Sequence, residues 1–177
     1  AIALLVAAGD DYAGATTIFR TPLAPVLPAR PTGRVFEEPF KATITSEGAK
    51  HPVTRGLPGA GVDGKAPTWG RWFRQAEVKG ERGATVMSGA QESPLLLLEK
   101  RGKGRVALLT SDHAWLWARG FEGGGPHSDL LRRLSHWLMK EPDLEEERLL
   151  ASAKGLKITL ERHSMGETVG PVRVTAD

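Results

Sequence analysis

The sequence SPLLLLEKRGKGRVALLTSDHAWLW, residues 93–117, carries both the strongest fold signal in the chain and its densest group of reactive side chains. Its two apolar runs, Leu95–Leu98 and Val106–Leu109, have the length of strands that are buried on both faces. Between them, Glu99–Gly104 contains two glycines and several charged residues, which predicts a solvated turn. We therefore expect a β-hairpin whose second strand runs directly into Ser111-Asp112-His113.

The carboxyl ends of two strands define the candidate site. Residues 2–8 form the other clear apolar strand, and it ends in a turn that contains Asp10 and Asp11. In open α/β sheets, ligands and catalytic groups gather at the carboxyl ends of strands. We therefore expect Asp10, Asp11, Asp112 and His113 to share one edge of the sheet, with Trp115 close enough to line a pocket there.

Two interpretations of this cluster remain open at the level of sequence. In one, a histidine and carboxylates bind a small ligand or perform acid–base chemistry. In the other, Asp112 caps the short helix that follows it and His113 is a hydrogen-bonded structural residue. A metal site is chemically allowed, but no ligand spacing supports it. A serine hydrolase is disfavoured because Ser88 lacks the G-x-S-x-G elbow that exposes a nucleophile.

Composition narrows the function further. The 177 residues, 40% of them hydrophobic and 25% charged, suit one cored domain and the beginning of a second. The chain contains no cysteine, which removes disulfides, thiolate metal sites and a cysteine nucleophile. Its net charge of +3 comes from interleaved acidic and basic residues, a pattern that disfavours nucleic-acid binding. No cofactor is indicated.

The remainder of the chain predicts an α/β domain over residues 1–153. Five closely spaced prolines rule out a long helix or a central strand over residues 22–39. Residues 69–78 and 83–88 read as two neighbouring strands. A helix that begins at Pro126 has one apolar stripe, and Pro142 either ends it or bends the chain into a second helix. Residues 154–177 predict a β-hairpin of 156–163 with 169–175, either an appendage or the truncated start of a β-rich domain.

Several short motifs follow one another in residues 1–150. They are His51-Pro52-Val53-Thr54-Arg55-Gly56-Leu57, Ser93-Pro94-Leu95-Leu96, Gly102-Lys103-Gly104-Arg105-Val106, Ser111-Asp112-His113-Ala114-Trp115-Leu116-Trp117 and His136-Trp137-Leu138. In this order and spacing they resemble the class I glutamine amidotransferase-like domain found near the C-terminus of large bacterial membrane proteins with von Willebrand factor A-like regions. The resemblance implies a flavodoxin-like or amidotransferase-like sheet flanked by helices.

The same resemblance argues against the family's own activity. True amidotransferases of this family use a cysteine nucleophile, a histidine and a glutamate two residues beyond that histidine. His113 matches the histidine, but Trp115 occupies the glutamate position and the chain has no cysteine. A carboxylate is a much poorer nucleophile than a thiolate, so glutamine hydrolysis by the family mechanism is disfavoured. With these partners missing, the structural interpretation of Asp112 and His113 is preferred.

The function expected from the sequence is therefore a non-catalytic interaction or scaffolding domain, and the alternative is a small-ligand sensor or hydrolase that uses the Asp/His cluster. The chain starts inside an apolar strand without a methionine, so we expect a piece of a longer protein. This opening is too short to span a bilayer and lacks the charged leader of a signal peptide. From the resemblance, the parent is expected in the bacterial inner membrane, with this domain on the periplasmic side. Its partners would be other parent domains or envelope proteins.

Overall fold

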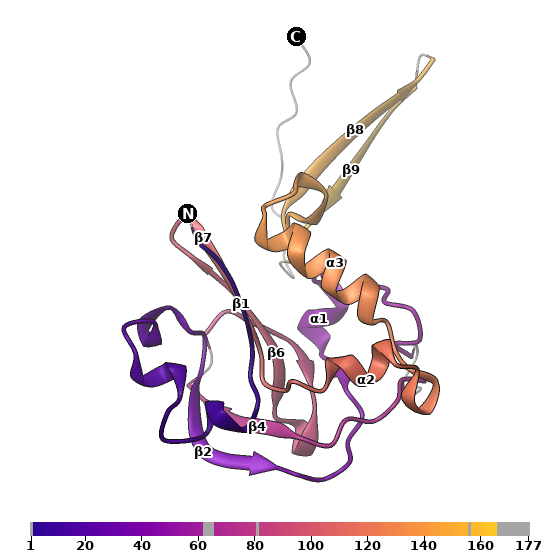
Figure 1. Cartoon of the computed structure of the whole chain (residues 1–177). Coiled ribbons are helices and arrows are strands. Elements are labelled where there is room, and N and C mark those ends of the chain that lie inside the picture. Colours follow the sequence, from indigo (N-terminus) through magenta and orange to yellow (C-terminus); the bar gives the residue numbers. More distant parts are fainter. Residues whose placement is uncertain (1, 62–65, 81, 156, 166–177) are drawn as a thin grey trace.

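The computed structural model describes residues 2–61, 66–80, 82–155 and 157–165, and it shows a mixed α/β fold built on a five-stranded mixed sheet (Figure 1). The strand order is β1-β7-β6-β5-β3. Only β1 and β7 pair in parallel; the other three pairs in this sheet are antiparallel. The strands are β1 (Ala3–Ala7), β3 (Thr43–Ile44), β5 (Ala84–Ser88), β6 (Pro94–Arg101) and β7 (Gly104–Leu109).

The predicted hairpin, formed by β6 and β7, lies at the centre of this sheet. Its strands are paired from Leu96 with Leu109 to Arg101 with Gly104, which leaves Gly102 and Lys103 as the turn. Gly102 has a φ of 56°, a conformation that glycine adopts without steric cost. The predicted turn was too long, because Glu99 lies within β6 and is only 7% exposed. Its carboxylate lies 3.4 Å from Arg101 and 3.6 Å from Arg82, and this pairing allows a charged residue to stay in a buried strand.

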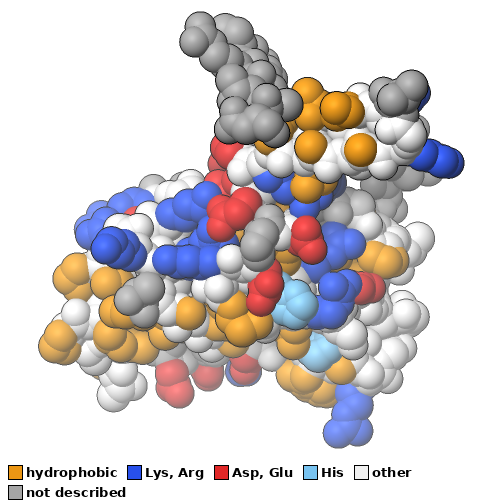
Figure 2. Space-filling view, turned by 90° about the horizontal axis from the view of Figure 1, so that it is seen from above, with side chains coloured by type: hydrophobic (Ala, Val, Ile, Leu, Met, Phe, Trp, Pro, Cys, Tyr) orange, Lys and Arg blue, Asp and Glu red, His pale blue; other side chains and the backbone are white. Residues whose placement is uncertain are grey.

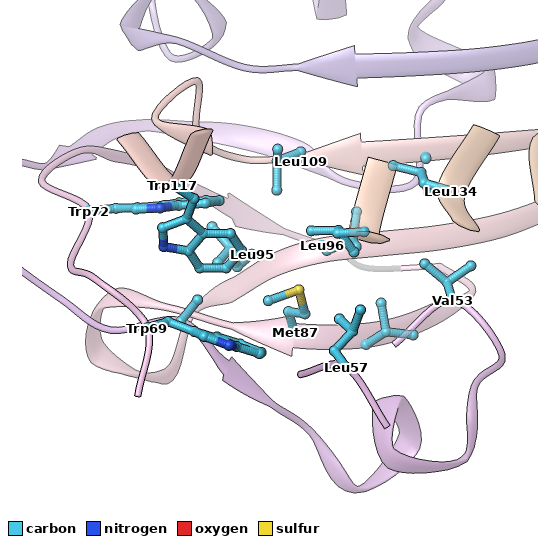
Figure 3. Packing of buried hydrophobic residues seen from close by; sticks show 14 of the residues in the cluster. Val53, Leu57, Trp69, Trp72, Met87, Leu95, Leu96, Leu109, Trp117 and Leu134 are labelled. Atoms are coloured by element: carbon cyan, nitrogen blue, oxygen red, sulfur yellow. The ribbon is translucent and has the colours of Figure 1, made fainter. Parts of the chain in front are cut away.

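Helices cover one face of the sheet. They are α1 (Ser46–Lys50), α2 (Ala114–Ala118) and α3 (His127–Leu138), and α1 was not expected from the sequence. The predicted apolar stripe of α3 is confirmed, since Leu130, Leu134 and Trp137 are buried against the sheet. Figure 3 shows Leu134 of this stripe near Leu96 of β6, and Leu109 of β7 belongs to the same buried cluster.

A two-stranded antiparallel sheet covers the opposite face. It pairs β2 (Arg30–Phe36) with β4 (Gln75–Lys79) and buries Leu97 and Leu108 of the central hairpin. The expectation that residues 69–78 and 83–88 form neighbouring strands was wrong, because β4 lies in this small sheet while β5 pairs with β6 and β3. The proline-rich passage contains one short 3₁₀ turn, η3 (Ala24–Val26), and the strand β2. The 3₁₀ turns of the chain are η1 (Asp10–Tyr12), η2 (Ile18–Arg20), η3 (Ala24–Val26), η4 (Ala90–Glu92), η5 (Phe121–Gly123) and η6 (Pro142–Leu144).

A second hairpin projects from the body of the molecule (Figure 1). Its strands are β8 (Arg148–Lys154) and β9 (Lys157–His163), and they form a sheet of their own. Of the two alternatives left open at Pro142, the second helix is absent in this described segment, where a single 3₁₀ turn leads into β8. β9 therefore pairs with β8, and the partner predicted for it, 169–175, lies outside the described residues. The predicted domain boundary at residue 153 falls inside β8 and stays a prediction.

Candidate functional site

The parallel pairing of β1 with β7 creates the site. The two strands run in register from Ala3 beside Arg105 to Ala7 beside Leu109, and the Ala8 amide donates to the Leu109 carbonyl. The turns that follow both strands consequently lie at the same edge of the sheet. Asp10 belongs to one turn, and Asp112 and His113 belong to the other.

Arg74, which precedes β4, joins the two turns. Its Nη2 donates to Asp112 Oδ2 over 2.7 Å, and its Nη1 lies 3.7 Å from Asp10 Oδ1. The hydrogen bond to Asp112 raises the pKa of Arg74, so the guanidinium stays charged. Gly9 makes room for this contact, since a Cβ there would lie 3.2 Å from Asp112 Oδ2. The cluster is therefore an arginine that lies between two carboxylates, with Asp112 closer to its guanidinium than Asp10.

No pattern in the sequence indicates Arg74 as a member of the site. It reaches the site because the β4 ribbon docks beside the end of β7, where the Ala76 amide donates to the Thr110 carbonyl over 2.8 Å. Ser111 strengthens the same junction by donating from Oγ to the Arg74 carbonyl over 2.6 Å. Such a contact between separate sheets has no local sequence pattern.

Asp11 does not join the cluster. It lies in the same 3₁₀ turn as Asp10, but it is exposed, and in the described part of the chain its carboxylate makes no hydrogen bond or ion pair. Its backbone carbonyl only closes the turn by accepting from Gly14. The structure therefore brings together Asp10, Asp112 and His113 and leaves Asp11 apart.

His113 is held by the backbone. The amide of Phe73 donates to His113 Nδ1 over 3.2 Å, while His113 Nε2 lies 3.9 Å from Asp112 Oδ1. Burial lowers the pKa of His113 below its usual 6.5, Asp112 opposes this shift, and Arg74 adds to it. The ring is thus neutral at pH 7, with its proton on Nε2 because Nδ1 acts as an acceptor.

The expectation that Asp112 caps the following helix was wrong. The N-cap of α2 is His113, without a side-chain cap. Ser111 instead accepts from the His113 amide over 3.2 Å, and the Asp112 carboxylate turns toward Arg74. A charge-assisted hydrogen bond to a guanidinium is stronger than a bond to a neutral backbone amide, which accounts for this choice.

Trp115 and Trp117 have opposite environments. Trp115 is 54% exposed and meets the edge of the His113 ring, with centroids 6.4 Å apart. Trp117 is buried against Trp69 and Trp72 (Figure 3), and its indole nitrogen donates to the Gly70 carbonyl. An extended segment would place both on one side, but α2 is helical, and two helical residues turn the side chains by about 200°.

The cluster lies on the surface. Four cavities of the described structure lie elsewhere, and the roomiest of these, about 890 Å³, is lined by residues of the segments 41–61 and 66–68. Within the described residues, no group of three or more histidine, aspartate or glutamate side chains is arranged to hold a metal ion. An arginine–carboxylate bridge beside a neutral histidine and an exposed tryptophan is suited to surface recognition.

Comparison with known proteins supports the fold alone. No protein-family model and no curated protein matches the sequence. Two solved structures are similar: cytoplasmic protein STM1381 from Salmonella typhimurium LT2, with a TM-score of 0.58 and 20% identity, and cytoplasmic protein STM3548 from Salmonella typhimurium, with 0.57 and 21%. The matches cover 76% and 75% of this chain but 54% and 53% of those chains, so the chain spans about half of either structure.

These findings overturn the expected location. The sequence suggested a parent in the bacterial inner membrane and a periplasmic domain, whereas both similar structures are described as cytoplasmic proteins. In addition, no helix among the described residues is long and apolar enough to cross a bilayer. The shared architecture is a mixed α/β fold, and this chain is similar in fold to the two Salmonella proteins.

Proposed function

We propose that this chain is a non-catalytic interaction or scaffolding domain that binds a protein partner through the surface around Trp115. The partner is another domain of its parent chain or a separate protein. The observation that carries the proposal is the 54% exposure of Trp115 above polar groups that are already engaged inside the molecule. Large aromatic side chains of this kind dominate the binding energy of protein interfaces.

The polar groups beneath Trp115 support a structural role. A histidine acts as a general base through an unprotonated ring nitrogen. In His113 that nitrogen is Nδ1, which already accepts from the Phe73 amide. Ser111 Oγ is likewise committed, since it donates to the Arg74 carbonyl and accepts from the His113 amide. Neither side chain is free to start a hydrolytic reaction in this arrangement.

An aromatic surface extends from Trp115. His113 contacts the Trp115 ring and binds the backbone of Phe73, and the Phe73 ring meets Phe121 with centroids 5.6 Å apart. Phe121 is partly exposed, and the neighbouring Arg71 forms an ion pair with Glu122. Apolar anchors beside a charged rim are the usual composition of a protein interface. We name the surface of Trp115, Phe121 and Phe73 the aromatic surface.

The amidotransferase-like and flavodoxin-like assignment belongs to this proposal. It rests on the motifs in the sequence and is compatible with the parallel β1–β7 pair and the helices on one face. The other three strand pairs of the main sheet are antiparallel, whereas a flavodoxin-like sheet is parallel. The resemblance is therefore best applied to the β1–β7 edge and α3.

The test is site-specific cross-linking followed by affinity measurement. A photoreactive phenylalanine replaces Trp115 in the protein, in the cells that produce it. Leu23, which is 42% exposed in another region, serves as the control site. A partner cross-linked only from position 115 is purified and titrated calorimetrically. We expect Trp115→Ala to weaken its binding by about 2 kcal/mol or more, and Leu23→Ala to leave it unchanged.

The proposal fails in either of two ways. Equal affinity of the partner for the wild type and Trp115→Ala would remove the aromatic surface from the interface. Steady turnover of an amide, ester or phosphoester that disappears in His113→Ala would show that the cluster is catalytic.

A second candidate function, a small-ligand sensor, is favoured by two buried atoms. Asp112 Oδ1 and Arg74 Nε have no hydrogen-bond partner among the described residues. A ligand hydroxyl that donates to the first and accepts from the second would satisfy both. Titration of glycerol and simple sugars, followed by the NMR signals of the His113 ring, tests this function. It requires saturable shifts that Asp112→Asn abolishes, and linear shifts would reject it.

A further inference from the structure

The outer edge of β1 is open. Within the described part of the chain, β7 pairs with one edge of β1 and no strand pairs with the other. Ile2 accepts from the Arg105 amide and Ala8 donates to Leu109, so the even-numbered residues bond to β7. In a parallel pair the alternate residues face away, and the N–H and C=O groups of Ala3, Leu5 and Ala7 therefore point outward.

This edge carries none of the usual protection against pairing. β1 reads ALLVA, without a charge or a proline, and its register with β7 is regular. Leu5 is 41% exposed and the adjoining Ile2 is 61% exposed. Natural edge strands are normally shielded by lysine, proline or a bulge, because bare edges recruit other strands. An unshielded apolar edge is therefore a docking surface for an extended strand.

The charges at the two ends of β1 are of opposite sign. Asp10 and Asp11 are exposed at its carboxyl end. At its amino end lies the β6–β7 turn with Arg101 and Lys103, both exposed, since the Arg105 amide bonds to Ile2 there. Figure 2, which views the end of the body where β1 begins, shows lysine and arginine side chains gathered there. The edge is thus acidic at one end and basic at the other.

We propose that the occupant of this edge is a second copy of the chain, paired antiparallel β1 to β1 across a twofold axis near Leu5. Antiparallel pairing places the acidic end of one protomer beside the basic end of its partner, and the symmetry repeats the contact. A parallel copy would bring like charges together. The two five-stranded sheets then form one continuous sheet, and Lys103 of each protomer faces Asp11 of the other.

The test begins with sedimentation velocity of the 177-residue chain from about 1 μM to about 1 mM. We expect a reversible dimer that Leu5→Pro abolishes, because proline removes an outward N–H while leaving the β7 ladder intact. Leu5→Lys, which keeps the backbone donor, should weaken the dimer by at least about tenfold through its charge at the edge. Leu23→Lys, at an equally exposed leucine, is the matched control and should dimerise normally.

Charge reversal identifies the partner and its direction. Lys103→Glu alone and Asp11→Lys alone should each weaken self-association by about tenfold. An equimolar mixture of the two variants should form heterodimers with wild-type affinity, since both contacts between positions 103 and 11 then join opposite charges. The proposal is overturned by a chain that stays monomeric up to 1 mM, by a dimer indifferent to both Leu5 variants, or by a mixture that restores nothing.

Discussion

The two well-formed hairpins of this chain, β6–β7 and β8–β9, have similar turns and opposite surroundings. Each turns at a glycine of positive φ, Gly102 in the first and Gly155 in the second. β6–β7 is apolar in continuous runs and buried on both faces, whereas β8–β9 alternates and is exposed. One face of β8–β9 carries exposed apolar side chains together with Arg162; these apolar residues are Leu149, Ala151, Ala153, Ile158 and Leu160. Figure 2 shows hydrophobic side chains exposed on this hairpin.

A hairpin is stabilised by the residues that pack on its two faces and by the strands that pair with its edges. An isolated two-stranded hairpin is at best marginally stable in water. β6–β7 has strands at both edges and a layer on each face. β8–β9 is joined to the body by polar contacts, such as Arg148 with Asp143 and Arg55 with His163. The sequence of β8–β9 is amphipathic, which is typical of a hairpin that has one of its two faces covered.

The largest effect is expected from truncating matched leucines of the two hairpins. Leu108→Ala in β7 leaves a cavity between the main sheet and the β2–β4 ribbon and should lower the free energy of unfolding by about 2–5 kcal/mol. Leu160→Ala in β9 removes a side chain that is 47% exposed, so it should change the free energy of unfolding by less than about 0.5 kcal/mol. Urea denaturation of both variants measures this, and equal losses would contradict the contrast between the hairpins.

An intermediate effect is expected at the end of β7. Asp112→Asn keeps the shape of the side chain but removes the charge that binds Arg74, and both side chains are partly exposed. We expect a loss of about 1 kcal/mol in the free energy of unfolding. Asp10→Asn, 3.7 Å from the same guanidinium and 65% exposed, is the control and should cost less than about 0.5 kcal/mol. A larger loss from Asp10→Asn than from Asp112→Asn would show that Asp112 is not the main partner of Arg74.

A smaller effect is expected from pH. Burial lowers the pKa of His113 in the folded state, so the unfolded chain binds a proton more readily. This contribution to stability is complete above the unfolded pKa of about 6.5 and declines as the pH falls through that value. The urea concentration at the denaturation midpoint should decrease as the pH is lowered below about 6.5. In His113→Gln this decrease should be smaller. His136→Gln, on α3, is the control and should leave the pH dependence of the midpoint unchanged. If His113→Gln also leaves it unchanged, the pH dependence does not come from His113.

The elements whose signal is local could be predicted from the sequence. The leucine runs of β6 and β7 and the apolar stripe of α3 follow from residue spacing alone, and the structure confirms them. Arg74 and the burial of Glu99 depend on contacts between segments distant in the chain, so no pattern announced them. Leu149 and Leu150 suit an amphipathic helix as well as a strand, so the sequence pattern after Pro142 could not distinguish a second helix from β8.

The decisive measurement is the protonation state of the His113 ring, because we propose that the cluster at the end of β7 is structural and that Trp115 is the residue that binds the partner. ¹⁵N NMR of the histidine ring at pH 7 reports which nitrogen carries the proton. The account predicts a neutral ring protonated at Nε2, with Nδ1 accepting from Phe73, and the same state in Trp115→Ala. A ring that is cationic at pH 7, or protonated at Nδ1, would leave His113 available for chemistry and contradict the account.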